Sequence, residues 1–356
     1  MHTDAALVFF FPECEVRTLS PLGQGNINRT LRIELADGAT WVLQRLHPGV
    51  FTDAEAVMGN MRLVADCLAA NDDATMRFFR LGTNPQGQDR FIDGDGCCWR
   101  LLSLVEPSRC LERLDNPAQA AGIGRLLGRF HRLTASVPVA QLADPLPGFH
   151  ITPRYLADYD ALIARISPSH SGEERCAGLI EQFRPLAPLL EEQRDVLSEC
   201  IIHGDPKVGN FLFAAEGDAA ISLIDLDTVK PGLLLHDLGD CLRSCCNPLG
   251  EGHGEVSAIR FVPELFASLM YGYLQQAGDL LNAADRRLLV SAAAVISFEL
   301  GLRFFSDHLA GNRYFTITWP GQNLHRSLVQ LQLCQSILGQ QEHLESLLRG
   351  LLAMSR

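Results

Sequence analysis

The chain has 356 residues, which is enough for two domains of ordinary size and a large buried core. Its hydrophobic fraction of 47% and charged fraction of 20% are typical of a globular protein and exclude disordered, collagen-like and coiled-coil chains. The formal net charge of -12 argues against nucleic acid or an anionic membrane surface as the main partner, because phosphate groups select for an excess of Lys and Arg.

The N-terminal part carries strand signals, and the turn Ala36-Asp37-Gly38 separates two of them as in an antiparallel hairpin. Apolar residues at helical spacing predict a helix that starts at Asp53 and runs through Ala70. This combination predicts a small β-rich lobe with one helix. The predicted strands are 27–35, 40–46, 76–81 and 97–106.

After Asn116, a predicted N-cap followed by Pro117, the pattern becomes mainly helical. The exception is the segment 198–226, where two short apolar runs flank a polar loop and predict short strands. We therefore expect an N-terminal nucleotide-binding lobe over residues 1–106 and a C-terminal helical lobe over residues 107–356. Long amphipathic helices are predicted at 257–277, 284–309 and 324–352.

We expect a cytoplasmic protein without a membrane partner. The most apolar run, 288–298, is shorter than the roughly 18 residues of a membrane span, and the N-terminus lacks the basic segment of a signal peptide. The 11 cysteines form no CxxC pair, which favours reduced thiols over disulfides. Buried thiols are also favoured over a zinc site, because the spacing of the one candidate cluster matches no tetrahedral pattern. That cluster is Cys241, Cys245, Cys246 and His236.

The strongest chemical signal is Asp205 followed five residues later by Asn210. Phosphoryl transfer to a hydroxyl needs a carboxylate that accepts the proton and oxygen ligands that hold Mg²⁺ on the nucleotide phosphates. The kinase catalytic loop has this Asp–Asn spacing, and a second Asp at a strand end supplies the remaining ligand. Asp225 follows the apolar run 220–224 and fits that position. Either feature alone is explained equally well by an ordinary turn, but their order and separation together favour phosphotransferase chemistry.

The segments HGDPKVGN (203–210) and IDLD (224–227) resemble the aminoglycoside phosphotransferase and choline kinase superfamily. This resemblance implies an α+β, protein-kinase-like fold with a small antiparallel β-sheet lobe and a larger, mainly helical lobe. A narrower resemblance, to the N-acetylhexosamine 1-kinase branch, covers nearly the whole chain. That branch phosphorylates the anomeric hydroxyl of N-acetylglucosamine or N-acetylgalactosamine with ATP and Mg²⁺. The segments that carry it are 23–28, 41–46, 148–153, 225–232 and 299–309.

The superfamily resemblance implies that Asp205 is the catalytic base and that Asn210 and Asp225 bind Mg²⁺. Lys207 lies two residues after the base, where an ammonium group would neutralise the transferring phosphoryl group. Asp227 is expected either to add a second metal ligand or to hold the loop.

Two further residues are expected to support this loop. His203 is predicted to orient it, since phosphoryl transfer needs little proton chemistry beyond the acceptor hydroxyl. The resemblance implies that Asp237 braces the backbone of the loop.

The predicted nucleotide loop contains Gly23 and Gly25, whose backbone N–H groups would approach the phosphates of ATP. Asn28 stands where the protein-kinase pattern has its third glycine, so we expect this loop to bind phosphate differently or to contact the substrate in part. Asn26 occupies a position where the branch often has His, and it is a candidate contact to the sugar.

The strand 42–45 aligns with the VAIK strand of kinases, which places Arg45 where the lysine contacts the α- and β-phosphates. A shift of one residue would place the neutral Gln44 there. We favour Arg45 because the phosphates need a positive charge. Glu55 is the candidate ion-pair partner of Arg45, and its alternative role is to interact with the positive end of its own helix.

On the acceptor side, Glu299, Arg303 and Asp307 recur every four residues in an apolar helix and so share one face. They form either an ion-pair ladder or, as the branch resemblance implies, a site where Arg303 reaches the sugar or the phosphate. His150 is a second-tier candidate for the sugar hydroxyls, and a hydrogen-bonded loop histidine is favoured over that role.

The leading hypothesis is an ATP- and Mg²⁺-dependent kinase that acts on the anomeric hydroxyl of an N-acetylhexosamine or related sugar. The first alternative is the same reaction on an aminoglycoside, choline or another small alcohol. The second is a kinase-like protein that binds nucleotide without turnover. Such proteins usually lose the base or a metal ligand, whereas Asp205, Asn210 and Asp225 are all present.

Overall fold

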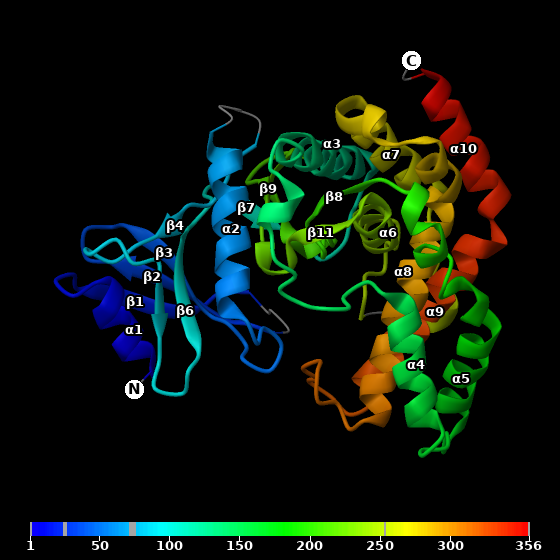
Figure 1. Ribbon diagram of the computed structural model, residues 1–356, viewed down its shortest axis with the longest axis horizontal. Helices are drawn as coiled ribbons and strands as arrows, with labels where there is room; N and C mark the ends of the chain where they lie inside the picture. Colours follow the sequence, from blue (N-terminus) through cyan, green and yellow to red (C-terminus); the bar gives the residue numbers. More distant parts are fainter. Residues whose placement is uncertain (1, 24–26, 71–75, 253, 355–356) are drawn as a thin grey trace.

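The computed structural model describes residues 2–23, 27–70, 76–252 and 254–354. Its N-terminal part is an antiparallel sheet in the order β1-β2-β3-β6-β4, with β5 paired to β6. Figure 1 shows this sheet beside a larger group of helices, with α2 (Ala54–Ala69) between them. The strands are β1 (Val16–Pro21), β2 (Arg29–Leu35), β3 (Thr40–Arg45), β4 (Leu81–Gly82), β5 (Arg90–Ile92) and β6 (Cys98–Ser103).

The two faces of this sheet belong to different cores, because successive side chains of a strand alternate between faces. Leu43 of β3 and Leu101 of β6 pack with residues of α1 (His2–Phe10). Val42 and Leu102 belong to the core that includes Met61 of α2. The alternation therefore decides which side chains of β3 and β6 can face the second lobe.

The predicted hairpin is confirmed, since β2 and β3 pair antiparallel and Gly38 adopts φ +88° in the turn. The predicted helix start at Asp53 is also confirmed, because its carboxylate accepts a hydrogen bond from the Ala56 N–H. The sequence did not predict α1 or β1, and the predicted strand 76–81 is reduced to the two residues of β4.

The C-terminal part is mainly helical, so the predicted α+β arrangement in two lobes is confirmed. Asn116 caps α3 by accepting a hydrogen bond from Gln119 N–H, and Pro117 lies in the first turn. The stretch predicted as one helix at 324–352 forms two, because the backbone leaves helical geometry at Gln340. The helices are α3 (Pro117–Thr134), α4 (Thr152–Ile163), α5 (Ser171–Phe183), α6 (Leu234–Cys245), α7 (Pro263–Ala277), α8 (Ala283–Leu309), α9 (Gln322–Gly339) and α10 (Gln341–Met354).

Two small antiparallel sheets lie within the helical part. One contains β7 (Ser108–Cys110), β9 (Phe211–Ala214) and β10 (Ala220–Leu223), and the other contains β8 (Glu199–Ile202) and β11 (Lys230–Leu233). The chain passes from β6 of the large sheet to β7 of the second lobe across residues 104–107. The domain boundary at residue 106 stays a prediction.

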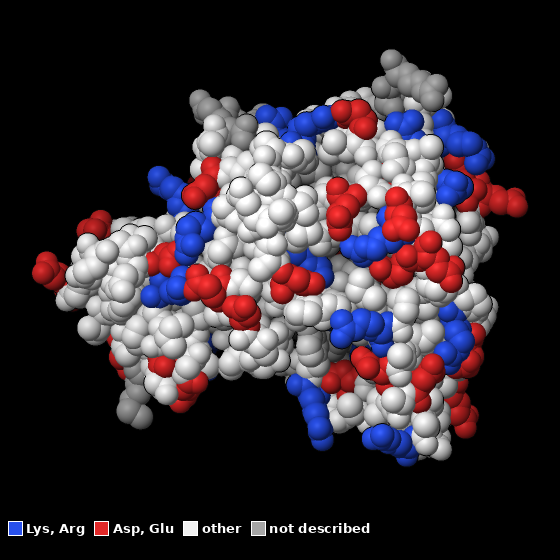
Figure 2. Space-filling view, in the orientation of Figure 1, with Lys and Arg blue, Asp and Glu red and all other residues white. Residues whose placement is uncertain are grey.

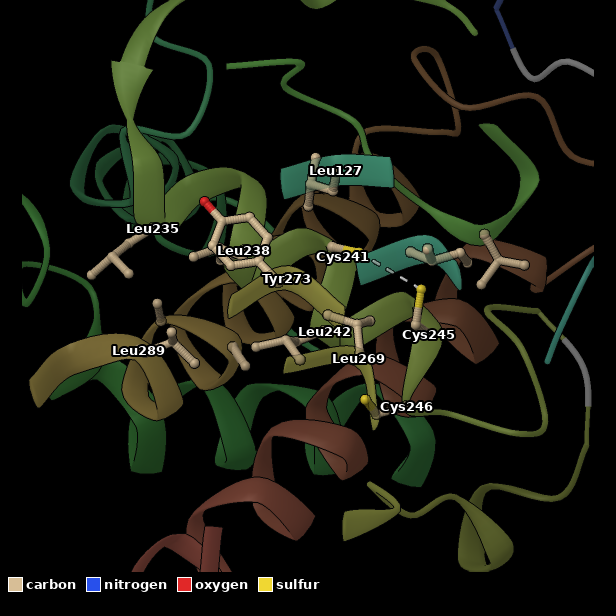
Figure 3. Close-up of a cluster of buried hydrophobic side chains, with 14 of the residues drawn as sticks. Leu127, Leu235, Leu238, Cys241, Leu242, Cys245, Cys246, Leu269, Tyr273 and Leu289 are labelled. Atoms are coloured by element: carbon tan, nitrogen blue, oxygen red, sulfur yellow. Dashed lines mark hydrogen bonds between the residues drawn. The ribbon is translucent and has the colours of Figure 1, made fainter. Parts of the chain in front are cut away.

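The core of the helical lobe lies between α3, α6, α7 and α8. Figure 3 shows leucine side chains of these helices around Cys241, Cys245 and Cys246. All three thiols are buried, and all 11 cysteines are free, as predicted. The Cys241 and Cys245 sulfurs are 3.8 Å apart, far beyond the length of a disulfide bond.

Helices α3 and α7 cross with their backbones in contact. A Cβ at Gly124 would lie 1.9 Å from the carbonyl oxygen of Leu269, and a Cβ at Gly272 would lie 2.1 Å from that of Ala121. Glycine is required at both positions because any side chain would separate the helices. This close contact fixes α3, which carries a histidine to the candidate site.

Helix α8 is long and apolar enough to cross a membrane by length and composition alone, but 83% of its most apolar window is buried inside the fold. Packing in the centre of the helical lobe therefore accounts for its apolar character. On the face shown in Figure 2, basic and acidic side chains are intermixed over both lobes.

The buried carboxylate of Asp93 holds together the turn that connects β5 to β6. Its Oδ1 accepts hydrogen bonds from the backbone N–H groups of Asp95 and Cys97, and its Oδ2 accepts from Trp99 Nε1 and Arg45 Nε at 2.8 and 3.1 Å. Burial acts to raise the pKa of Asp93, but the Trp99, backbone and Arg45 donors outweigh it and lower the pKa to about 2.

We expect Asp93→Asn to lower the free energy of unfolding by about 2 kcal/mol at neutral pH. Because the folded-state pKa lies below the ordinary value of 3.8, the charge stabilises the fold above pH 4 and the stabilisation is lost as the pH falls toward 2. Urea unfolding of both proteins across this range measures the difference. Asp95→Asn, at a neighbouring exposed carboxylate, is the control, with a loss below about 1 kcal/mol expected. A loss for Asp93→Asn that does not change with pH would contradict this account.

Candidate active site

The predicted catalytic segment is a tight turn between β8 and β9. Gly204 adopts φ +86°, and a Cβ there would lie 2.7 Å from the carbonyl oxygen of Thr228. The Thr228 hydroxyl donates to the carbonyl of His203 at 2.8 Å, and a ring nitrogen of His203 lies 2.9 Å from the carbonyl of Ile224. The turn is thereby fixed to the segment that follows β10, as predicted for His203.

Asp237 of α6 holds the same turn from the other side. Its two carboxylate oxygens accept the backbone N–H groups of His203 and Gly204 at 2.6 and 2.7 Å, and His131 of α3 lies 2.9 Å from Oδ2. Burial acts to raise the pKa of Asp237, but His131 and these hydrogen bonds lower it overall. The expectation that Asp237 braces the loop backbone is confirmed.

The turn brings Asp205, Lys207 and Asn210 together. Lys207 Nζ lies 2.5 Å from Asp205 Oδ2, and Asn210 Nδ2 donates to the same oxygen at 3.1 Å. Burial acts to raise the pKa of Asp205, but the Lys207 ammonium lowers it below its usual value. Asp205 is therefore ionised at neutral pH, and its Oδ1 has no hydrogen-bond donor among the described residues.

Asp225 follows β10 and faces this group with φ +68°, a left-handed conformation that is rare for a residue with a side chain. Burial, the neighbouring carboxylate of Asp227 and that of Asp205 raise the pKa of Asp225 to about 7. No hydrogen bond to the Asp225 carboxyl is found within the described parts of the chain. A buried carboxyl with this excess of negative charge around it is suited to a bound cation.

The donor set fits Mg²⁺, which prefers carboxylate and amide oxygens. The Nδ2 of Asn210 is used by Asp205, whereas its Oδ1 has no donor among the residues that the structure describes. Asn210 Oδ1 and the Asp225 carboxylate could therefore hold the ion, as the sequence predicts.

Asp227 points away from this group, toward the β-sheet lobe. Its Oδ2 accepts a hydrogen bond from Asn28 Nδ2, and its Oδ1 lies 2.5 Å from Nη2 of Arg100 on β6. Both oxygens are thus occupied by protein groups, which argues against the metal-ligand role and favours the alternative that Asp227 holds the loop. Asn28, expected near the phosphates, instead joins Asp227 to the backbone N–H of His47.

A model of the Phosphotransferase enzyme family, APH, matches residues 18–278. The chain belongs to this family. Among solved structures, the chain is similar to the amicoumacin kinase hAmiN in complex with AMP-PNP and Ca²⁺, with a TM-score of 0.64, 14% identity, and 93% and 92% of the two chains covered. It is also similar to a microcompartment-associated aminopropanol kinase, with a TM-score of 0.62, 16% identity and 95% and 97% covered. An ethanolamine kinase of Plasmodium vivax has a TM-score of 0.57, 12% identity and 93% and 85% covered.

These likenesses show the fold, and the family match shows a phosphotransferase. Within the predicted nucleotide loop, Gly23 is exposed with φ +72°, while Gly25 and Asn26 lie outside the described residues.

The placement of Arg45 differs from the prediction. Arg45 lies on the outer face of β3, where it pairs with Asp93 and Asp95, and Glu55 pairs with Arg90 of β5. The predicted Arg45–Glu55 ion pair is wrong, because alternation along β3 turns residue 45 to the α1 side of the sheet. The residue that faces the second lobe is Gln44, the register that the sequence analysis did not favour.

Arg303 of α8 lies in a group of four aromatic rings. Its guanidinium carbon is 5.0 Å from the ring centres of Phe149 and Tyr155, and 5.7 and 5.5 Å from those of Tyr314 and Phe315. This geometry is that of cation–π contacts. No described residue accepts a hydrogen bond from Arg303.

The charge of Arg303 lies within electrostatic range of the predicted base. Burial acts to lower the pKa of Arg303, but Tyr155, Tyr314, Glu299 and Asp205 raise it overall. The guanidinium is therefore charged, and the Asp205 carboxylate contributes to keeping it so.

The ion-pair ladder, one of the two alternatives for this face of α8, is not formed, because Glu299 and Asp307 contact other segments. Glu299 accepts from the Thr152 hydroxyl at 2.7 Å and lies 3.0 Å from Nδ1 of His150. Asp307 accepts backbone N–H groups of residues 313–315 and a hydrogen bond from Asn323, so it fixes the loop that carries two of the rings around Arg303.

His150 is a second-tier candidate for the sugar hydroxyls, and its contacts instead favour the role of a hydrogen-bonded loop histidine. The ring is buried, with Nδ1 on Glu299 and Nε2 2.7 Å from the carbonyl oxygen of Gly204. Burial acts to lower the pKa of His150, but Glu299 outweighs it and raises the pKa overall. His150 therefore ties α8 to the catalytic turn, as the alternative interpretation held.

The sequence analysis missed Arg100, which lies on the sheet face turned toward Asp227. It is fully buried and donates two hydrogen bonds to Gln44 Oε1. A signal was present, since a basic residue in an otherwise apolar strand is unusual.

We expect Asp237→Asn to lower the free energy of unfolding by about 2–4 kcal/mol, because the amide cannot accept two backbone N–H groups and face His131 as the carboxylate does. Denaturant unfolding measures the loss. The control is Asp160→Asn, a surface carboxylate paired with Arg184, for which a loss below about 1 kcal/mol is expected. Equal losses in the two variants would show that the turn does not depend on Asp237.

Proposed function

We propose that this phosphotransferase is an ATP- and Mg²⁺-dependent kinase that transfers the γ-phosphoryl group to the anomeric hydroxyl of an N-acetylhexosamine or related sugar. The observation that carries the choice of acceptor is Arg303, a charged group surrounded by rings, near Asp205, with no acceptor among the described residues.

The charge at this position disfavours a cationic acceptor. Two of the similar structures are kinases named for aminopropanol and ethanolamine. An ammonium group needs a free carboxylate near the reacting hydroxyl, and Arg303 would repel it. On this face of α8 the carboxylates of Glu299 and Asp307 are already occupied by protein groups.

A neutral acceptor with carbonyl and hydroxyl oxygens suits the same group. The guanidinium of Arg303 offers five N–H donors in one plane, which can bind an N-acetyl carbonyl or ring hydroxyls. The rings of Tyr155 and Tyr314 provide surfaces for the apolar face of a sugar. An N-acetylhexosamine meets both conditions.

In the proposed mechanism, Asp205 accepts the proton of the acceptor hydroxyl. Its Oδ2 is held by Lys207 and Asn210, which leaves Oδ1 for the hydroxyl. Lys207 then neutralises the charge of the transferring group. Asn210 and Asp225 are the proposed ligands of Mg²⁺, which supplies positive charge to the nucleotide phosphates when bound.

We expect Asp205→Asn to lower turnover by two or more decades while ADP affinity changes less than about threefold, because the amide cannot take the proton. Steady-state turnover and calorimetric titration with ADP give the two quantities. Asp158→Asn, at an exposed carboxylate of α4, is the control and is expected to keep normal turnover. Near-normal turnover of Asp205→Asn would exclude Asp205 as the base.

The acceptor is tested by ATP consumption with Mg²⁺ across N-acetylhexosamines, other free sugars, aminoglycosides and amino alcohols. We expect turnover on an N-acetylhexosamine, with an anomeric phosphate in the phosphorus NMR spectrum. Arg303→Gln should lower kcat/KM for the sugar by about 100-fold and leave the KM for ATP unchanged, since a lost charged hydrogen bond costs about 1.5–3 kcal/mol. Arg287→Gln, at the start of the same helix, is the control. Turnover on amino alcohols alone would refute the sugar acceptor.

A further inference from the structure

The inner face of β3 carries no positive charge. Gln44 pairs in register with Arg100 of β6, while Arg45 pairs with Trp99 on the opposite face. Protein kinases place a lysine on this third strand, where it contacts the α- and β-phosphates. In this chain the side chain that faces inward from β3 is a neutral amide.

The positive charge on that face comes from the neighbouring strand. Arg100 donates from Nε and Nη2 to Gln44 Oε1 at 3.0 and 2.7 Å, and its Nη2 lies 2.5 Å from Asp227 Oδ1. Gln44 is in turn held by a hydrogen bond from its Nε2 to the Thr30 hydroxyl at 3.1 Å. The guanidinium is therefore fixed in a row that crosses three strands.

One nitrogen of the Arg100 guanidinium makes no hydrogen bond to a described residue. This nitrogen, Nη1, is buried and has no hydrogen-bond acceptor among the residues that the structure describes. An unsatisfied N–H of a buried charged group is costly, and native proteins rarely keep one without a reason. Phosphate oxygens are suited to such a donor, because a guanidinium binds them by parallel hydrogen bonds.

The position of Arg100 relative to the proposed metal ligands is also suitable. Its ion-pair partner Asp227 is two residues from Asp225 in the same loop. The ion pair therefore ties the guanidinium to the segment that carries a proposed ligand of Mg²⁺, the ion that would share the nucleotide phosphates.

We propose that Arg100 is the cation that binds the α- and β-phosphates of the nucleotide, with Gln44 as its positioning residue. The phosphate-binding charge thus stands on β6 instead of β3. The assignment rests on the proposed nucleotide-dependent function but is independent of the acceptor. The competing interpretation is that Arg100 only joins the two lobes through Asp227.

The test compares ADP with adenosine, which lacks phosphates, by calorimetric titration in the presence of a chelator so that no metal contributes. We expect Arg100→Gln to weaken ADP binding at least tenfold, about 1.4 kcal/mol, and to change adenosine binding less than twofold. Arg45→Gln, a neighbouring arginine on the outer face of the sheet, is the matched control and should leave both affinities unchanged.

A second variant places the positive charge on β3 instead of β6. We expect Gln44→Lys combined with Arg100→Gln to recover ADP binding to within about threefold of the original protein, because a lysine at position 44 faces the same space. Adenosine binding and circular dichroism confirm that each variant is folded. Recovery in this variant is not expected if Arg100 acts only as a clamp on Asp227.

The proposal is overturned if Arg100→Gln weakens ADP no more than Arg45→Gln does, or weakens ADP and adenosine equally. Failure of the acceptor proposal is separate: a protein that binds ADP but phosphorylates no sugar leaves the comparison of the Arg100 variants intact. Absence of ADP binding by the unchanged protein would overturn both proposals.

Discussion

The catalytic region depends on one buried carboxylate, that of Asp237. It accepts two consecutive backbone N–H groups of the turn after β8 and also faces His131 of α3. Helix α3, helix α6 and the turn after β8 are thereby joined through one side chain. Because Gly204 leaves no room for another arrangement against Thr228, the direction in which Asp205 points follows from this contact.

The aspartates around this turn differ in whether a basic side chain lies next to them. Asp205 has Lys207 as a close partner, and Asp227 has Arg100, but Asp225 has no described partner and a raised pKa. Among these three carboxyls, the one expected to meet a metal ion is therefore the one without a basic partner among the described residues. On the acceptor side the imbalance is opposite, since Arg303 is charged and its neighbouring carboxylates are occupied.

Much of the fold and the catalytic turn could be predicted because the signals are local. The spacing of Asp205 and Asn210, the cap at Asn116 and the turn at Gly38 each depend on a few adjacent residues. Which residue of β3 faces the second lobe could not be predicted in this way, because Gln44 and Arg45 are both polar. Only the packing of α1 and α2 against the sheet decides which of the two faces inward. The partner of Gln44 is 56 residues away on another strand. The partners of His150 could not be predicted for the same reason, because they lie in α8 and in the turn after β8.

The row of hydrogen bonds from Thr30 through Gln44 to Arg100 affects how chains of this fold are classified as active or inactive from sequence. A survey that requires a lysine on the third strand would count Gln44 as a loss and place this chain among degenerate kinase relatives. The strand pairing shows that the neutral residue and the buried guanidinium occupy adjacent places in one sheet. To separate active from inactive members of this fold by sequence, one therefore has to ask which strand carries the basic residue. The presence of a lysine at one aligned position of the third strand is not a necessary criterion.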